Sequence, residues 1–142
     1  EGFIDDENSL VSSMERPFEY DGPPSLDGMV VTGLAKGRWV GLDERIATGR
    51  ITRMDADSYW LAMRSTYLRQ ADVALIPASV ARYLLIHHGM SGKLHFSRRA
   101  HSRYSRHFLV TAGDQVLDYL GGQLPVLVQG REWRAVLLRY GQ

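Results

Sequence analysis

Three side chains occur along the chain in an order that suits nucleophilic chemistry on an acyl group: Ser58, His107 and Asp118. A hydroxyl can attack a carbonyl carbon when an imidazole takes its proton, and a carboxylate can hold that imidazole in the required orientation. Ser58 lies where we expect a helix to begin, and the partial positive charge of a helix N-terminus favours an anionic nucleophile. Ser58 is therefore the candidate nucleophile, His107 the candidate base and Asp118 its orienter.

A second group of side chains lies in one basic segment, residues 95–107. From Val73 to Gly113 the chain contains no acidic residue, and all five histidines fall within that stretch. Guanidinium groups bind phosphates, and imidazoles can transfer protons during RNA cleavage. The candidate residues for binding an anion or a nucleic acid are Arg98, Arg99, His101, Arg103 and Arg106.

Both groups also have a purely structural explanation. A serine beside aspartates at the start of a helix is most often an N-cap. Residues 1–27 hold eight acidic residues against one basic residue, Arg16, so this segment could be the intramolecular partner of the basic one. Three classes of function thus stay open, namely an acyl hydrolase or transferase, an RNA-directed module, and a non-catalytic interaction domain.

The composition indicates neither a metal site nor a membrane span. The chain has no cysteine and its histidines are scattered, so no metal-ligand spacing is present, and no motif requires a cofactor. No apolar run approaches the roughly 20 residues that a membrane-spanning helix needs. We expect a soluble protein, either cytoplasmic or secreted.

The elements that must position these residues follow from periodicity. Helical spacing predicts a helix within residues 55–70 and a second one from Pro77 to Gly89. β-branched and aromatic runs bounded by glycines predict a strand at 93–96 and two hairpins, at 107–120 with a turn at 112–114 and at 124–140. Helices followed by antiparallel strands indicate an α+β fold. We expect residues 1–27 to be an acidic, extended leader and residues 28–142 to form a single domain.

This order of features resembles the papain-like thiol hydrolases, a superfamily that includes effector and toxin-type proteases, deamidases and transglutaminases of bacteria. The matching stretches are 57–62 at the start of a helix, 106–110 at the start of a strand, and 117–123 on the next strand. The superfamily uses a cysteine nucleophile, whose position Ser58 occupies here. The resemblance implies N-terminal helices packed on a C-terminal antiparallel sheet, and an enzyme acting on an amide of a protein substrate, either a peptide bond or a glutamine side chain.

Overall fold

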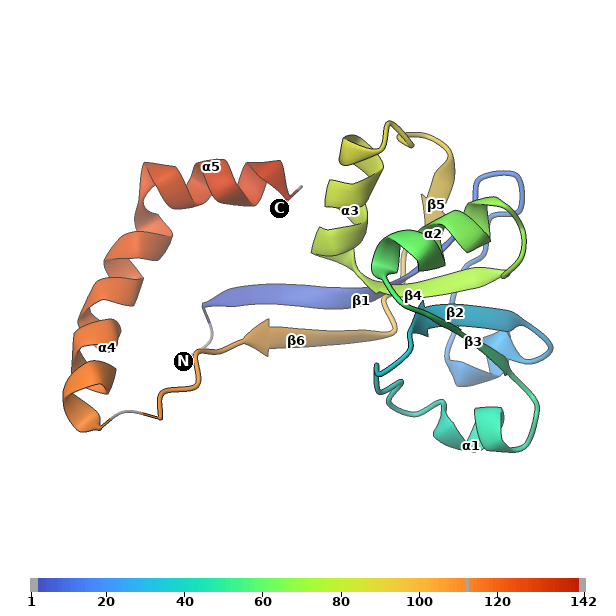
Figure 1. Ribbon diagram of the computed structural model, residues 1–142, viewed down its shortest axis with the longest axis horizontal. Coiled ribbons are helices and arrows are strands. Elements are labelled where there is room, and N and C mark those ends of the chain that lie inside the picture. The colour runs from blue at the N-terminus through green and yellow to red at the C-terminus, as the bar shows by residue number, and fades with distance from the viewer. Residues whose placement is uncertain (1–2, 112, 141–142) are drawn as a thin grey trace.

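The computed structural model describes residues 3–111 and 113–140 of the chain. These residues form one mixed sheet with helices on both faces, followed by two helices that extend away from it (Figure 1). The elements are β1 (Ile4–Ser13), the 3-10 helix η1 (Pro23–Leu26), β2 (Val30–Leu34), α1 (Asp43–Ala47), β3 (Thr52–Ala56), α2 (Tyr59–Tyr67), β4 (Val73–Pro77), α3 (Ala78–His87), β5 (Leu94–Phe96), β6 (Ser102–Arg106), α4 (Asp114–Gln129) and α5 (Arg131–Arg139).

The sheet has a parallel half and an antiparallel half. Its strand order is β3-β2-β4-β1-β5, and β6 also pairs with β1. Strand β2 is parallel to β3 and β4, whereas β1 is antiparallel to β4, β5 and β6. Parallel neighbours need crossover connections, which α1 and α2 supply between β2, β3 and β4. Long strand β1 therefore joins the parallel half to β5 and β6.

The core lies on both faces of this sheet. All five residues of β4 are buried, and successive side chains alternate between faces because a strand has a period of two. Val73 and Leu75 pack in one cluster with Leu10, while Ala74 and Ile76 pack in the other. Helices α2 and α3 cover the second face, and α1 lies across the sheet from them (Figure 1).

Several predicted elements are confirmed. Helix α2 falls within the predicted 55–70, α3 follows Pro77 as expected, and β5 coincides with the predicted strand at 93–96. The mixture of helices and strands in one chain is also as predicted. The papain-like arrangement is wrong, because the sheet is mixed and helices rather than hairpins occupy the C-terminal part.

The N-terminal segment differs from the expected extended leader. Residues 4–13 form β1, whose second half is fully buried. The polar sequence of its first half, Asp5 to Asn8, has low strand propensity. The charge of these residues is matched by β6, since Glu7 lies opposite Arg103 in the pairing register and Asp6 forms an ion pair with Arg106. The pairing partner lies almost a hundred residues along the chain, so local sequence patterns do not reveal it.

The C-terminal segment forms helices where we predicted hairpins. The β-branched residues, Gly121-Gly122 and Pro125 all favour strands and turns over helices. Nevertheless residues 114–129 form α4 with Pro125 inside it, and 131–139 form α5. Apolar residues at 117, 120, 124 and 128 have helical spacing, and this was the signal that the sequence offered. The turn predicted at 112–114 includes residue 112, which lies outside the described residues.

Candidate functional site

The structure does not bring the three candidate catalytic residues together. Ser58 lies at the start of α2, His107 is exposed just after β6, and Asp118 is exposed on α4. Helices α2 and α4 lie at opposite ends of the molecule (Figure 1). The side chain of Ser58 accepts a hydrogen bond from the Leu61 N–H at 3.2 Å, which is N-cap geometry. Ser58 therefore has a structural role in starting α2.

The basic segment is paired with the acidic N-terminal segment. Arg103 contacts Glu7 at 3.2 Å, and Arg106 contacts Asp6 at 3.0 Å. A further ion pair between the two segments joins Glu19 and Arg98 at 3.3 Å. The other pairs are Glu19 with His95, and Asp21 with Arg99. The expectation that the two segments are partners within one chain is confirmed.

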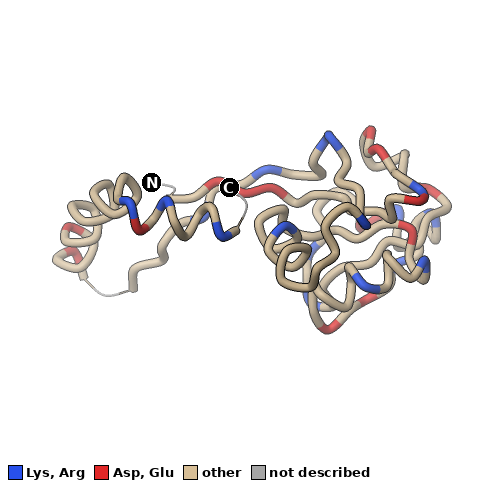
Figure 2. The backbone as a smooth tube through the Cα atoms, turned by 90° about the horizontal axis from the view of Figure 1, so that it is seen from above, with Lys and Arg blue, Asp and Glu red and all other residues tan. Residues whose placement is uncertain are grey.

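These pairs balance the charge of the arginines with acidic side chains, although Arg98, Arg99 and Arg103 stay largely exposed. Figure 2 shows basic and acidic positions interspersed through the body of the molecule. His101 is half-buried, its ring lies 5.9 Å from that of Tyr20, and burial lowers its pKa. His101 is consequently a neutral packing residue at pH 7 and not a phosphate-binding group.

Asp6 is the centre of the most connected polar cluster. Its carboxylate accepts hydrogen bonds from the Ser79 hydroxyl at 2.6 Å, the Arg106 guanidinium at 3.0 Å and the Tyr104 hydroxyl at 3.3 Å. Backbone N–H groups of Glu7 and Ser79 also donate to it, at 2.9 and 3.3 Å. One side chain thereby connects β1, β6 and the N-terminus of α3.

The cluster shifts the acidity of its members. Burial alone would raise the pKa of Asp6, but hydrogen bonds from Ser79, Arg106 and Glu7 hold that pKa below its ordinary value. Burial, and next the charge of Asp6, raise the pKa of Tyr104 to about 12. Asp6 is therefore ionised and Tyr104 is protonated at neutral pH. The side chain of Asp6 is only 1% exposed. Its main role is therefore to stabilise the fold, and it offers a ligand almost no accessible surface.

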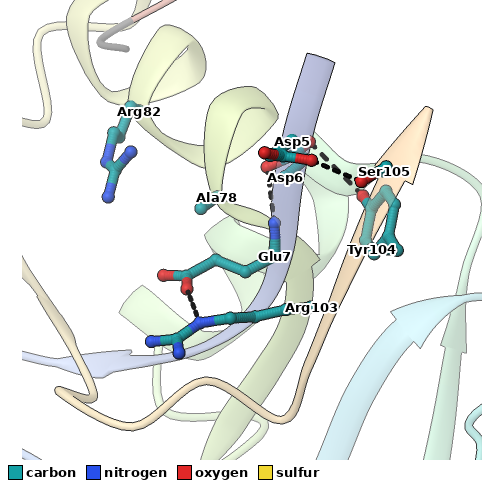
Figure 3. Close-up of a pocket in the computed structure, with 8 residues that line it drawn as sticks. All are labelled: Asp5, Asp6, Glu7, Ala78, Arg82, Arg103, Tyr104 and Ser105. Atoms are coloured by element: carbon teal, nitrogen blue, oxygen red, sulfur yellow. Dashed lines mark hydrogen bonds and ion pairs between the residues drawn. The ribbon is translucent and has the colours of Figure 1, made fainter. Parts of the chain in front are cut away.

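A polar pocket lies beside this cluster, at the carboxyl end of β4. Its volume is about 690 Å³. Figure 3 shows its lining residues, which come from the start of β1, the first turns of α3 and the middle of β6. They are Asp5, Asp6, Glu7, Ala78, Arg82, Arg103, Tyr104 and Ser105. Three carboxylates and two guanidinium groups thus surround one opening, so the pocket presents both signs of charge.

The charged groups at the pocket mouth make exposed, weak contacts with one another. Arg103 is 79% exposed and pairs with Glu7, while Asp5 accepts a hydrogen bond from the Ser105 hydroxyl. An exposed ion pair contributes about 0–1 kcal/mol, so Glu7 and Arg103 can exchange this contact for one with a ligand at little cost. Arg103 is the one candidate anion-binding residue from the sequence that lines this pocket.

Sequence reasoning missed the pocket residues other than Arg103, and three of them are acids on β1. Asp5, Arg82 and Tyr104 belong to segments that are distant along the chain, and no motif joins them. The available signal was the complementary charge of residues 1–27 and 95–107, which indicated contact between segments but no pocket. Within the described ranges, no group of three His, Asp or Glu side chains could hold a metal ion. None of the helices described there is long and apolar enough to cross a membrane.

Comparisons with known proteins identify the fold. The sequence matches no protein-family model, and the comparison with curated proteins also gives no match. Among solved structures, a mutant of ArgBP from T. maritima superposes with a TM-score of 0.71, over 97% of this chain and 58% of that chain, at 17% identity. The GluR0 ligand binding core complex with L-glutamate has a TM-score of 0.72, over 99% of this chain and 60% of that chain, at 8% identity.

A third structure belongs to the same group. The second substrate binding domain of a putative amino acid ABC transporter from Streptococcus pneumoniae has a TM-score of 0.64 at 13% identity, over 99% of this chain and 63% of that chain. The chain thus spans about 60% of the length of such structures. At these identities the comparison establishes only that the chain shares the fold of these three structures.

This fold overturns the hydrolase hypothesis. The neighbours named above are described as amino-acid-binding or substrate-binding proteins and not as papain-like hydrolases. The assignment to that superfamily is therefore wrong, and with it the predictions of an enzyme, a protease or deamidase, and an effector or toxin domain. Neighbours described with a ligand hold arginine or L-glutamate, not a protein substrate or a nucleic acid. The non-catalytic alternative agrees better with the structure.

Proposed function

We propose that the chain is part of a non-catalytic ligand-binding protein that takes a free amino acid, or a similar small zwitterion, in the pocket between β1, β6 and α3. The observation that supports this function most is a pocket with both signs of charge in a fold shared with arginine-binding and glutamate-binding proteins. Ligands of open α/β sheets bind at the carboxyl ends of strands, and the pocket adjoins that end of β4.

The charges suit the two ends of an amino acid. An α-ammonium group would contact the carboxylates of Asp5 or Glu7, which lie on β1. An α-carboxylate would contact the guanidinium of Arg103 on β6, and planar guanidinium groups bind carboxylates with two parallel hydrogen bonds. Ala78 lies at the first position of α3, so the helix N-terminus adds partial positive charge on the same side.

The test is a calorimetric titration of the 142-residue chain with glycine, L-arginine and L-glutamate. The same titration is made with derivatives of these amino acids that lack the charge of either the α-ammonium or the α-carboxylate group. Zwitterions are expected to bind, and N-acetylated or amidated derivatives are not. Arg103→Gln should weaken binding about tenfold, since the loss of one charged hydrogen-bond donor costs about 1.4 kcal/mol. Arg98→Gln is the matched control, because Arg98 is exposed and lies outside the pocket.

Two results would contradict the proposal. One is the absence of binding by all three amino acids. The other is equal binding by the derivatives that lack a charge, since the pocket would then not recognise a zwitterion.

A further inference from the structure

A second pocket lies at the other end of the sheet from the pocket beside Asp6. Val73, the first residue of β4, lines it, whereas the pocket beside Asp6 adjoins the carboxyl end of that strand. Its other walls are the turn after β1, the residue before β2, and the end of α2 with the turn that follows, which contains Arg69. We call it the Arg69 pocket. Its volume is about 320 Å³, which is enough for a small ligand.

The backbone of Arg69 has a conformation that favours glycine. Its φ angle is 61°, and among the described residues Arg69 is the one non-glycine residue with a positive φ. The Arg69 N–H donates to the Thr66 carbonyl at 3.1 Å and the Gln70 N–H to the Ser65 carbonyl at 2.9 Å, so α2 ends in a Schellman motif. Glycine is usual at this position because it has no Cβ atom. A strained residue that lines a pocket points to a function for its side chain.

Two guanidinium groups of the Arg69 pocket are available to an anion. Arg16, in the turn after β1, is exposed, and its side chain has no hydrogen bond or ion pair within residues 3–111 and 113–140. Arg69 contacts Glu15 at 3.3 Å, but the side chains of Arg69 and Glu15 are 63% and 73% exposed. Such an exposed pair contributes little to stability, because water competes for both groups. An anion in the pocket can therefore replace Glu15 at Arg69.

The remaining lining residues indicate the class of anion. The Asp72 carboxylate accepts a hydrogen bond from the Val30 N–H at 2.8 Å, which joins the starts of β2 and β4. Two guanidinium groups and one carboxylate leave the lining with an excess of one positive charge, which suits a singly charged anion. Pro17, Phe18 and Met29 add apolar surface. A guanidinium binds a carboxylate with two parallel hydrogen bonds, and apolar surface favours a hydrocarbon group.

We propose that the Arg69 pocket binds a small organic carboxylate, whose carboxylate group contacts Arg16 and Arg69 and whose hydrocarbon part contacts Phe18. This site is separate from the proposed zwitterion site, because the two pockets share no lining residue and lie at opposite ends of β4. Failure of either site to bind its ligand leaves the other proposal untouched.

The test is a nitrogen-15 NMR titration of the 142-residue chain with hexanoate, acetate, n-hexylamine and inorganic phosphate. Hexanoate should shift the amide signals of residues 13–18 and 66–73 with a midpoint in the millimolar range. Acetate should bind about tenfold less tightly, because it lacks the hydrocarbon chain that the pocket buries. The amine is a cation at pH 7 and should leave these signals unshifted.

Substitutions distinguish a ligand-binding arginine from a structural one. Arg69→Gly removes the guanidinium and also relieves the backbone, so it should weaken hexanoate binding about tenfold and leave the midpoint of thermal unfolding unchanged or higher. Arg16→Gln should also weaken binding about tenfold. Glu15→Gln should strengthen it, because the competing carboxylate is gone. Arg64→Gln is the matched control, since Arg64 is exposed on α2 and does not line the pocket.

Three results would overturn the proposal. One is the absence of hexanoate-dependent shifts at residues 13–18 and 66–73. Another is binding of acetate or phosphate at least as tight as that of hexanoate, since the apolar surface would then have no role. The third is hexanoate binding that Arg69→Gly and Arg16→Gln both leave unchanged, because neither guanidinium would then contact the ligand.

Discussion

The carboxylate of Asp6 holds three elements together at the point where the pocket opens. Because hydrogen bonds and Arg106 lower its pKa in the folded state, its contribution to stability is present above the ordinary pKa of aspartate, about 3.9. That contribution is lost as the pH falls through the lower folded pKa. Asp6→Asn should therefore reduce the free energy of unfolding by about 2 kcal/mol at pH 7 and flatten its dependence on pH below 4.

Urea unfolding at a series of pH values measures this effect. Asp118→Asn serves as the control, since Asp118 is exposed on α4 and has no part in the cluster. Equal stability of the wild type and Asp6→Asn at pH 7 would show that the Asp6 cluster contributes nothing to the fold.

Gly33 on β2 is required by a close contact. A Cβ atom at this position would lie 2.9 Å from the ring of Trp39 and 3.2 Å from the backbone oxygen of Leu75. Trp39 is 3% exposed, so a shift of its ring would disturb the packed core. Gly33→Ala should cost about 1–3 kcal/mol through overpacking, measured by thermal unfolding. Gly113→Ala is the control, since nothing lies within 4 Å of its added Cβ, and a similar loss there would argue against overpacking as the cause.

At the scale of elements, α2 depends on the cap that Ser58 provides. Ser58→Ala removes the acceptor for the Leu61 N–H and should destabilise the protein by about 1 kcal/mol, whereas Ser58→Asp keeps an acceptor and should be tolerated. Thermal unfolding of both variants checks this expectation. An unchanged midpoint for Ser58→Ala would mean that the cap is energetically irrelevant, and a large loss in Ser58→Asp would mean that the hydroxyl has another role.

The sequence predicted the elements whose signals are local. Helices α2 and α3 have apolar residues at helical spacing and end signals close by, so both were found. Strand β1 was missed because its acidic half is stabilised by Arg103 and Arg106, which are distant in sequence. The C-terminal helices were missed because glycine, proline and β-branched residues favour other structures.

The candidate site was predicted even less well from the sequence than the fold was. Its residues come from three segments, and of these residues only Arg103 was predicted as a binding residue. The catalytic hypothesis relied on the order of Ser58, His107 and Asp118 along the chain, and order alone does not determine distance in space. The one long-range feature that the sequence did indicate was the pairing of acidic and basic segments, because opposite net charges attract without requiring a register.

On the scale of the whole molecule, a mixed sheet presents a polar pocket at one end of β4, and helices α4 and α5 lie beyond the β1–β6 pair (Figure 1). The most direct measurement of ligand binding is a nitrogen-15 NMR titration of the chain with glycine, L-arginine and L-glutamate. Binding should shift the amide signals of residues 5–7, 78–82 and 103–105, which surround the pocket. Absence of shifts with every amino acid, or shifts confined to residues around Ser58 and His107, would contradict a zwitterion site between β1, β6 and α3.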